Sequence, residues 1–164
     1  MENEKYINII YFDSFGDTKE ILSNLNAFKK RTNGAFIFCR TINRFRALME
    51  EIKSKSRSNS TKNIFFHLIV SGSNSEKALE AIDEYEAKQN IKKICIYCFE
   101  PKIYIDKYQN NDYIEKSNIT RKKLNAIRFI EKNKSEEISS LKEEFNNEEE
   151  NIFIEPNDDM NIFL

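Results

Sequence analysis

The sequence predicts an α/β fold: a three-layer sandwich with a central parallel sheet of four to five strands. Short apolar, β-branched runs alternate with segments whose apolar residues recur every three or four positions. The run at 64–70, Ile-Phe-Phe-His-Leu-Ile-Val, is apolar on both strand faces, as expected for a strand covered by helices on both sides. We therefore expect right-handed crossovers and the strand order 2-1-3-4-5, with this run in the middle.

Composition agrees with one soluble α/β domain. The 164 residues include 40% hydrophobic residues and 13 Phe, enough for a sizeable core, whereas three Gly and two Pro are too few for a turn-rich β-sandwich. No apolar run approaches the ~20 residues of a membrane helix, and the charged residues 1–5 do not resemble a signal peptide. We expect a cytoplasmic or nuclear protein without membrane contact.

Charge divides the chain into two parts. Residues 134–164 carry ten acidic and two basic residues, a net charge of −8, and the remainder is +7. Such separation is typical of an acidic tail beside a basic body. We predict an α/β domain at 1–133 and, at 134–164, a helical extension with an acidic, partly disordered tail.

The first half of the chain predicts two strand–helix units. The strands are expected at 5–12 and 35–39. The first helix has an apolar face of Ile21, Leu22, Leu25 and Phe28 and should end at a left-handed cap on Gly34. The second, capped by Thr41 or Asn43, has the apolar face Phe45, Leu48, Met49 and Ile52. The polar, basic stretch 53–62 lacks periodicity and predicts a mobile surface loop.

The second half continues the alternation less regularly. After the strand at 64–70, Ser73 to Glu76 has capping-box spacing, and Ala78, Leu79, Ile82 and Tyr85 form a buried stripe. A fourth strand is expected at 91–99. Residues 102–118 fit strand and helix equally, with an edge strand between 113 and 119. A long helix should begin at Thr120, with the apolar positions Leu124, Ile127, Ile130, Ile138, Leu141 and Phe145.

Polar residues gather where the predicted parallel strands end. A candidate sheet-edge pocket consists of Asp13, Ser71, Gly72, Ser73 and Glu100. Serine hydroxyls at a helix N-terminus would suit a phosphate, yet neither G-x-G-x-x-G nor a P-loop is present. The alternative is an ordinary strand-to-helix turn.

Histidine and cysteine chemistry finds little support. His67, the only histidine, lies inside the central strand, where a core role is expected. Cys95 and Cys98 form a C-x-x-C, but an odd spacing on a strand directs them to opposite faces. Together with Cys39 they predict core cysteines, and we expect no metal and no cofactor.

The strand ends resemble those of phosphoacceptor receiver domains. In that family acidic residues follow the first strand, an aspartate ends the third, a Thr or Ser follows the fourth and a Lys follows the fifth. Asp13 matches one acidic position, but Val70-Ser71-Gly72 lacks the aspartate and Cys98 to Lys102 lacks the hydroxyl. The resemblance thus implies a pseudo-receiver without a Mg²⁺ site or nucleophile.

A closer resemblance is to a receiver-like module of some eukaryotic multidomain proteins. Leu68-Ile-Val-Ser-Gly72 and Ile94-Cys-Ile-Tyr-Cys-Phe99 are similar to its third and fourth strands. The similarity covers approximately 5–130 and leaves the acidic tail unmatched. It implies the fold and a non-catalytic role.

We therefore expect a non-catalytic interaction subunit or scaffold of a larger intracellular assembly, docking on protein partners through its C-terminal helix and tail. The apolar residues that would make this contact are Phe145, Ile152, Phe153, Ile162 and Phe163. One alternative is a phosphate- or nucleotide-binding protein, or degenerate enzyme, that uses the sheet-edge pocket. The other is a nucleic-acid-associated protein that uses the basic segments 29–31, 53–62 and 121–123.

Overall fold

The computed structural model describes residues 7–14, 18–58 and 65–134. It confirms the predicted fold class: five parallel strands form one sheet in the order β2-β1-β3-β4-β5. The strands are β1 (Ile9–Phe12), β2 (Phe36–Cys39), β3 (Phe66–Ser71), β4 (Ile91–Tyr97) and β5 (Ile119–Thr120). The central position of β3 agrees with its continuous apolar sequence, since every residue from Phe66 to Ser71 is buried.

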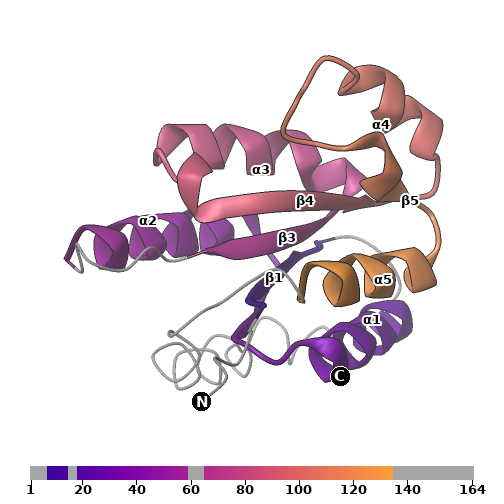
Figure 1. Cartoon of the computed structure of the whole chain (residues 1–164), viewed down its shortest axis with the longest axis horizontal. Helices are drawn as coiled ribbons and strands as arrows, with labels where there is room; N and C mark the ends of the chain where they lie inside the picture. Colours follow the sequence, from indigo (N-terminus) through magenta and orange to yellow (C-terminus); the bar gives the residue numbers. More distant parts are fainter. Residues whose placement is uncertain (1–6, 15–17, 59–64, 135–164) are drawn as a thin grey trace.

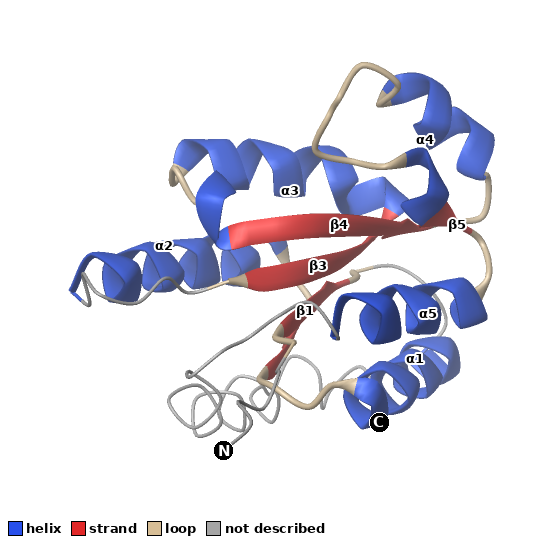
Figure 2. Cartoon of the chain, in the orientation of Figure 1, coloured by secondary structure: helices blue, strands red, loops and turns tan. Residues whose placement is uncertain are grey.

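Helices cover both faces of the sheet (Figures 1 and 2). The α-helices are α1 (Thr18–Arg31), α2 (Ile42–Ser58), α3 (Gly72–Glu84), α4 (Pro101–Lys107) and α5 (Lys123–Lys134), and short 3-10 helices lie at Lys88–Asn90 and Lys116–Asn118. Helices α1 and α5 pack side by side on one face, and α2 and α3 pack together on the other, with α4 beside α3. The fold is thus the predicted three-layer sandwich.

The alternation of side chains along β1 builds a separate core on each face. Ile10 and Phe12 join the core under α2 and α3, where Phe12 stacks on Phe45 with ring centroids 4.9 Å apart. Ile9 and Tyr11 join the core under α1 and α5, where Tyr11 meets the edge of Phe28 at 5.1 Å. One strand therefore contributes to both cores, as period-two geometry requires.

Two predictions for the first half of the chain were wrong. Residues 53–58 continue α2 rather than forming a loop, because lysine and arginine have high helix propensities and extend the helix after its apolar stripe ends at Ile52. Gly34 does not adopt a left-handed conformation. It is required for close approach instead: a Cβ there would lie 2.3 Å from the Asn8 Oδ1 atom and 2.4 Å from the Ile7 carbonyl oxygen.

The ambiguous stretch after β4 contains both types of structure. Residues 101–107 form α4, with Pro101 at its start, as its fixed φ favours. The fifth strand is present but has only two residues, Ile119 and Thr120, so its sequence signal was weak. The last described helix begins at Lys123, three residues after the predicted start. Leu22 of α1 and Leu124 of α5 were predicted to belong to the apolar faces of their helices, but both side chains are exposed.

His67 is a core residue, as predicted. Its side chain is 1% exposed and meets the edge of the Phe129 ring, with centroids 6.0 Å apart. Burial, reinforced by the positive charges of Lys93 and Lys92, lowers the pKa of His67 from about 6.5 to about 4. The imidazole is therefore neutral at physiological pH.

Among the described helices, none combines the length and hydrophobicity that a bilayer crossing needs.

The depressed pKa of His67 predicts acid sensitivity. The unfolded chain binds a proton below about pH 6.5 and the folded chain only near pH 4, so stability present above pH 6.5 is lost as the pH falls through this window. The loss should reach roughly 3 kcal/mol. Urea unfolding of the protein and of His67→Phe at several pH values measures it. The variant should be less pH-dependent between pH 6.5 and 4, and an unchanged slope would contradict this account.

Candidate functional site

A cavity of about 290 Å³ lies at the carboxyl edge of the sheet. All five residues of the candidate sheet-edge pocket line it: Asp13, Ser71, Gly72, Ser73 and Glu100. Asp13 follows β1, whereas Ser71 to Ser73 join β3 to α3. In the order 2-1-3, the chain reverses direction across the sheet between these strands, the point at which open α/β sheets bind ligands. The structure thus brings the predicted residues together, and ligand binding by them stays a prediction.

Helices α1 and α4 and the loop after β5 supply the remaining lining. Glu20 and Ile21 come from α1, Ile103 and Tyr104 from α4, and Arg121 follows β5. The end of β4 adds Tyr97, Cys98 and Phe99. The lining therefore combines three aromatic rings, two isoleucines, three carboxylates and one guanidinium group.

A buried chain of hydrogen bonds fixes Asp13. The Asn24 side-chain amide donates to the Tyr11 hydroxyl at 3.0 Å, and this hydroxyl donates to the Asp13 carboxylate at 2.7 Å. Asn24 and Tyr11 are fully or almost fully buried, and Asp13 is 7% exposed. Burial and the negative charge of Asp13 raise the pKa of Tyr11, which keeps the hydroxyl protonated as a donor. The carboxylate is thus held in one orientation at the cavity.

A second chain of hydrogen bonds joins the loops after β1 and β3. The Ser14 hydroxyl donates to Asn74 Oδ1 at 2.9 Å, and Asn74 Nδ2 donates to the Ser71 hydroxyl oxygen at 2.8 Å. Ser75 donates to the Gly72 carbonyl at 2.8 Å. Two of the three serine hydroxyls at the predicted phosphate site, those of Ser71 and Ser75, are therefore hydrogen-bonded within the protein. The third serine, Ser73, is exposed.

The capping box predicted at Ser73 to Glu76 was wrong. Helix α3 begins at Gly72, directly after β3, with Ser71 as N-cap and no side-chain capping bond. Glu76 instead pairs with Lys107 of α4 at 2.9 Å. The short connection leaves no room for a separate capping turn.

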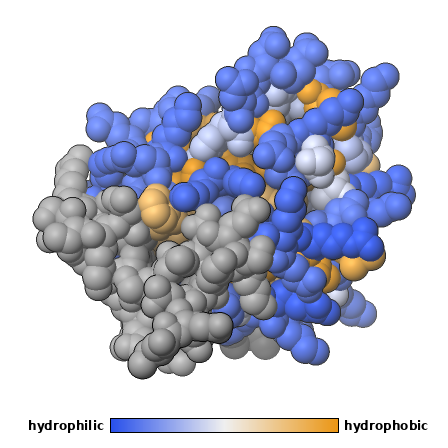
Figure 3. Space-filling view, viewed as in Figure 1, coloured by the Kyte–Doolittle hydropathy of each residue, from blue (hydrophilic) through white to orange (hydrophobic). Residues whose placement is uncertain are grey.

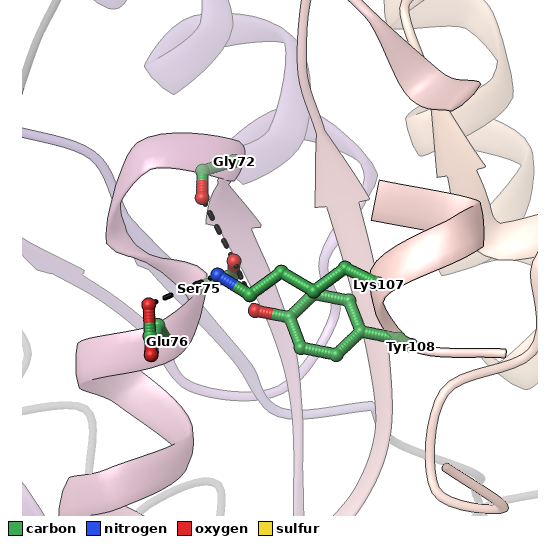
Figure 4. A network of polar contacts seen from close by, with 5 residues as sticks. All are labelled: Gly72, Ser75, Glu76, Lys107 and Tyr108. Atoms are coloured by element: carbon green, nitrogen blue, oxygen red, sulfur yellow. Dashed lines mark hydrogen bonds and ion pairs between the residues drawn. The ribbon is translucent and has the colours of Figure 1, made fainter. Parts of the chain in front are cut away.

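Two polar contacts hold α4 against the start of α3 (Figure 4). The Ser75 and Tyr108 hydroxyls are 2.7 Å apart, and Lys107 pairs with Glu76 on the surface. A Cβ on Gly72 would lie 2.6 Å from the Tyr104 ring. Glycine at this position therefore lets the Tyr104 ring cover the first turn of α3 and form one wall of the cavity.

Burial and nearby charges raise the pKa values of the two cavity tyrosines. Partial burial, together with the nearby charges of Glu20 and Asp13, raises the pKa of Tyr97. Partial burial raises the pKa of Tyr104 too, and Glu100 contributes to that rise. The positive charge of Lys107 acts in the opposite direction on Tyr104, and Arg121 is the opposing charge of the lining.

The cysteines lie as the strand pattern predicted. Cys95 belongs to the core under α1 and α5, whereas Cys98 packs against the opposite core. Burial raises the pKa of Cys98 to about 11, so its thiol is protonated at neutral pH. Within residues 7–14, 18–58 and 65–134, no group of three histidine, cysteine or acidic side chains is arranged to hold a metal ion.

Sequence reasoning missed Glu20, Tyr97, Tyr104 and Arg121. Tyr97 ends β4, and strand boundaries could have identified it. The positions of Glu20, Tyr104 and Arg121 depend on the bounds of α1, α4 and the two-residue β5, which the sequence left uncertain.

The proposed partner-binding residues Phe145, Ile152, Phe153, Ile162 and Phe163 lie outside the described residues.

The basic segments proposed for nucleic acid do not all converge. Residues 121–123 lie at the carboxyl edge, whereas 29–31 end α1 at the other edge, roughly 20 Å from the start of that helix. Arg31 also pairs with Glu131 at 2.6 Å, and Lys123 donates to Ser23. Of the stretch 53–62, residues 53–58 are described and end α2. A single basic surface formed by all three segments is therefore not supported.

Comparison of the chain with protein-family models, curated proteins and solved structures found no significant match.

The hydrogen bonds of Tyr11 predict a clear mutational effect. Tyr11→Phe leaves two buried polar groups, on Asn24 and Asp13, without this hydroxyl, so it should lower the free energy of unfolding by about 1–3 kcal/mol. Tyr104→Phe is the matched control because Tyr104 is only partly buried, and a change within about 0.5 kcal/mol is expected. Urea denaturation measures both, and equal losses would contradict the assignment.

Proposed function

We propose that this protein is a non-catalytic interaction subunit that docks on a partner protein through the carboxyl edge of its sheet. The distribution of exposed apolar side chains supports the proposal. Among the described residues, four large apolar side chains are exposed: Leu22 (39%), Phe99 (78%), Ile103 (53%) and Leu124 (54%). Each belongs to the loop after β4 or to the first two turns of α1, α4 or α5, which begin at the carboxyl edge.

Apolar exposure at one end of a domain is typical of an interaction site. The face seen in Figure 3 is mainly hydrophilic, with small apolar patches separated by polar side chains. Phe99 and Ile103 also line the cavity, so an apolar rim and a hollow with charged groups form one continuous surface. This combination suits a protein ligand, which would cover the rim and fill the hollow together.

The chemistry of the cavity favours binding over catalysis. The Cys98 thiol has a pKa of about 11 and the tyrosine hydroxyls have raised pKa values, so these potential nucleophiles are protonated and weak at neutral pH. His67 belongs to the core beneath Phe129. Asp13, a lining carboxylate that could act as a base, already accepts a hydrogen bond from the buried Tyr11 hydroxyl.

The proposal includes a relationship to receiver-like modules. The strand order and the position of Asp13 after β1 agree with that family's fold. Ser71 ends β3, where the family has its phosphoacceptor aspartate, so we propose a pseudo-receiver that has a binding surface instead of a phosphorylation site.

The acidic tail would be a second docking element. Residues 146–164 carry the apolar triplets Ile152-Phe153-Ile154 and Ile162-Phe163-Leu164 in an acidic context. We propose that the tail and the carboxyl edge contact the same assembly, which would raise the overall affinity through effective concentration.

A small-molecule ligand in the cavity is the second candidate function. The lining of the cavity favours a small-molecule ligand, because apolar walls with a few polar groups are typical of ligand sites. A phosphate or nucleotide fits poorly, since three carboxylates would repel it and two of the three serine hydroxyls are hydrogen-bonded internally.

Substitution of the apolar rim tests the proposal. Phe99→Asp/Ile103→Asp should weaken partner binding at least about tenfold without loss of stability, because both side chains are exposed. Gln89→Asp/Asn110→Asp adds the same charge on exposed residues away from the cavity and should bind normally. Quantitative affinity purification from the native cell at physiological salt, followed by a dissociation constant for the purified partner, measures the effect.

A third variant lacking residues 146–164 should also lose its partner while it folds normally. Normal binding by the rim variant would contradict docking through the carboxyl edge. Normal binding by the truncated chain would contradict only the proposed role of the tail, and docking through the carboxyl edge would stand.

A further inference from the structure

We infer that the carboxyl-edge cavity receives an arginine side chain of the protein partner. The inference rests on the proposed function and specifies the chemistry that the docking surface recognises. It follows from the charge of the lining, the aromatic walls, the spread of the carboxylates and the apolar rim.

The charge of the lining selects a cation. Asp13, Glu20 and Glu100 face one opposing guanidinium group, that of Arg121. Asp13 is 7% exposed and is held by the Tyr11 hydroxyl at 2.7 Å, so one carboxylate is preorganised at the floor. Glu20 and Glu100 are exposed and come from opposite walls, on α1 and before α4. A positively charged group is therefore attracted from three sides.

The aromatic walls select a planar organic cation. Tyr97, Phe99 and Tyr104 line the cavity, and a guanidinium group stacks on aromatic faces while its N–H groups reach carboxylates. The negative charges of Glu20 and Asp13 near Tyr97, which contribute to the raised pKa of its hydroxyl, strengthen this attraction. The two tyrosine hydroxyls also accept hydrogen bonds from such donors.

The spread of the carboxylates argues against a metal ion. The described acidic, histidine and cysteine side chains do not converge into a group of three that could coordinate one. An arginine side chain needs no such convergence, because its five donors point in several directions. A cavity of about 290 Å³ also has room for a guanidinium group and its methylene stem.

The rim identifies a polypeptide as the source of the cation. Phe99 and Ile103 are 78% and 53% exposed beside the cavity, and a free amine would leave them uncovered. Residues that flank the arginine in a partner would cover both side chains. Such an arrangement, a buried anchor surrounded by apolar contacts, is typical of protein interfaces.

Titration of the ¹⁵N-labelled full chain by NMR tests the inference with matched peptides. The probe is Ac-Leu-Arg-Leu-NH₂, and the control is Ac-Leu-Cit-Leu-NH₂, in which citrulline replaces arginine by a neutral group of similar shape. The arginine peptide should shift the amide signals of Tyr97 to Glu100 and of Ser73, and should bind at least about tenfold more tightly than the citrulline peptide. Equal affinities, or no shifts at these residues, would overturn the inference.

Charge variants locate the interaction. Glu20→Gln/Glu100→Gln should reduce the affinity for the arginine peptide about tenfold, whereas Glu80→Gln/Glu115→Gln, with the same change of net charge on exposed residues outside the cavity, should leave it unchanged. Equal losses in both variants would overturn the site. Agmatine, which carries the guanidinium group without a peptide, should bind more weakly than the peptide, and tighter binding would overturn the polypeptide source.

The two proposals fail separately. If the rim variant loses its partner but arginine and citrulline peptides bind equally, docking through the carboxyl edge stands and the arginine inference falls. If the peptides discriminate but the rim variant keeps its partner, the cavity binds guanidinium and the proposed docking surface is wrong.

Discussion

The burial of β1 and β3 on both faces is the constraint on which the rest of the structure depends. Every residue of these strands is buried, so the chain must cover both sides of the sheet with helices and return each time in the same direction. All five strands then end at one edge. The polar side chains that follow the strands therefore lie together at this edge.

The polar groups at this edge are largely satisfied by each other. Asn24, Tyr11 and Asp13 form one chain of hydrogen bonds, and Ser14, Asn74 and Ser71 form another. These bonds connect the loops after β1 and β3 and hold them in place, which makes the floor of the cavity rigid. The rim differs, because Phe99 and Ile103 are exposed. A rigid, negatively charged floor beneath an apolar rim is better suited to recognition than to a chemical step.

The sequence predicted the fold because its main signals are long-range and redundant. The apolar run at 64–70 required a central strand, and the alternation of elements required a parallel sheet in the observed order. Predictions failed where short-range signals compete. Basic residues 53–58 fit a loop or a solvated helix, β5 has only two residues, and Gly34 serves close packing rather than a cap. Five cavity residues followed from strand ends alone, whereas Tyr104 and Arg121 depend on the geometry of α4 and β5.

Photo-crosslinking in the native cell tests the central claim most directly, that the carboxyl edge is the docking surface. Benzoylphenylalanine replaces Phe99 at the rim in one variant and exposed Gln89, outside the cavity, in another. The account predicts a discrete adduct with one partner protein from position 99 and none from position 89. An adduct with the same partner from position 89 and none from position 99 would contradict it.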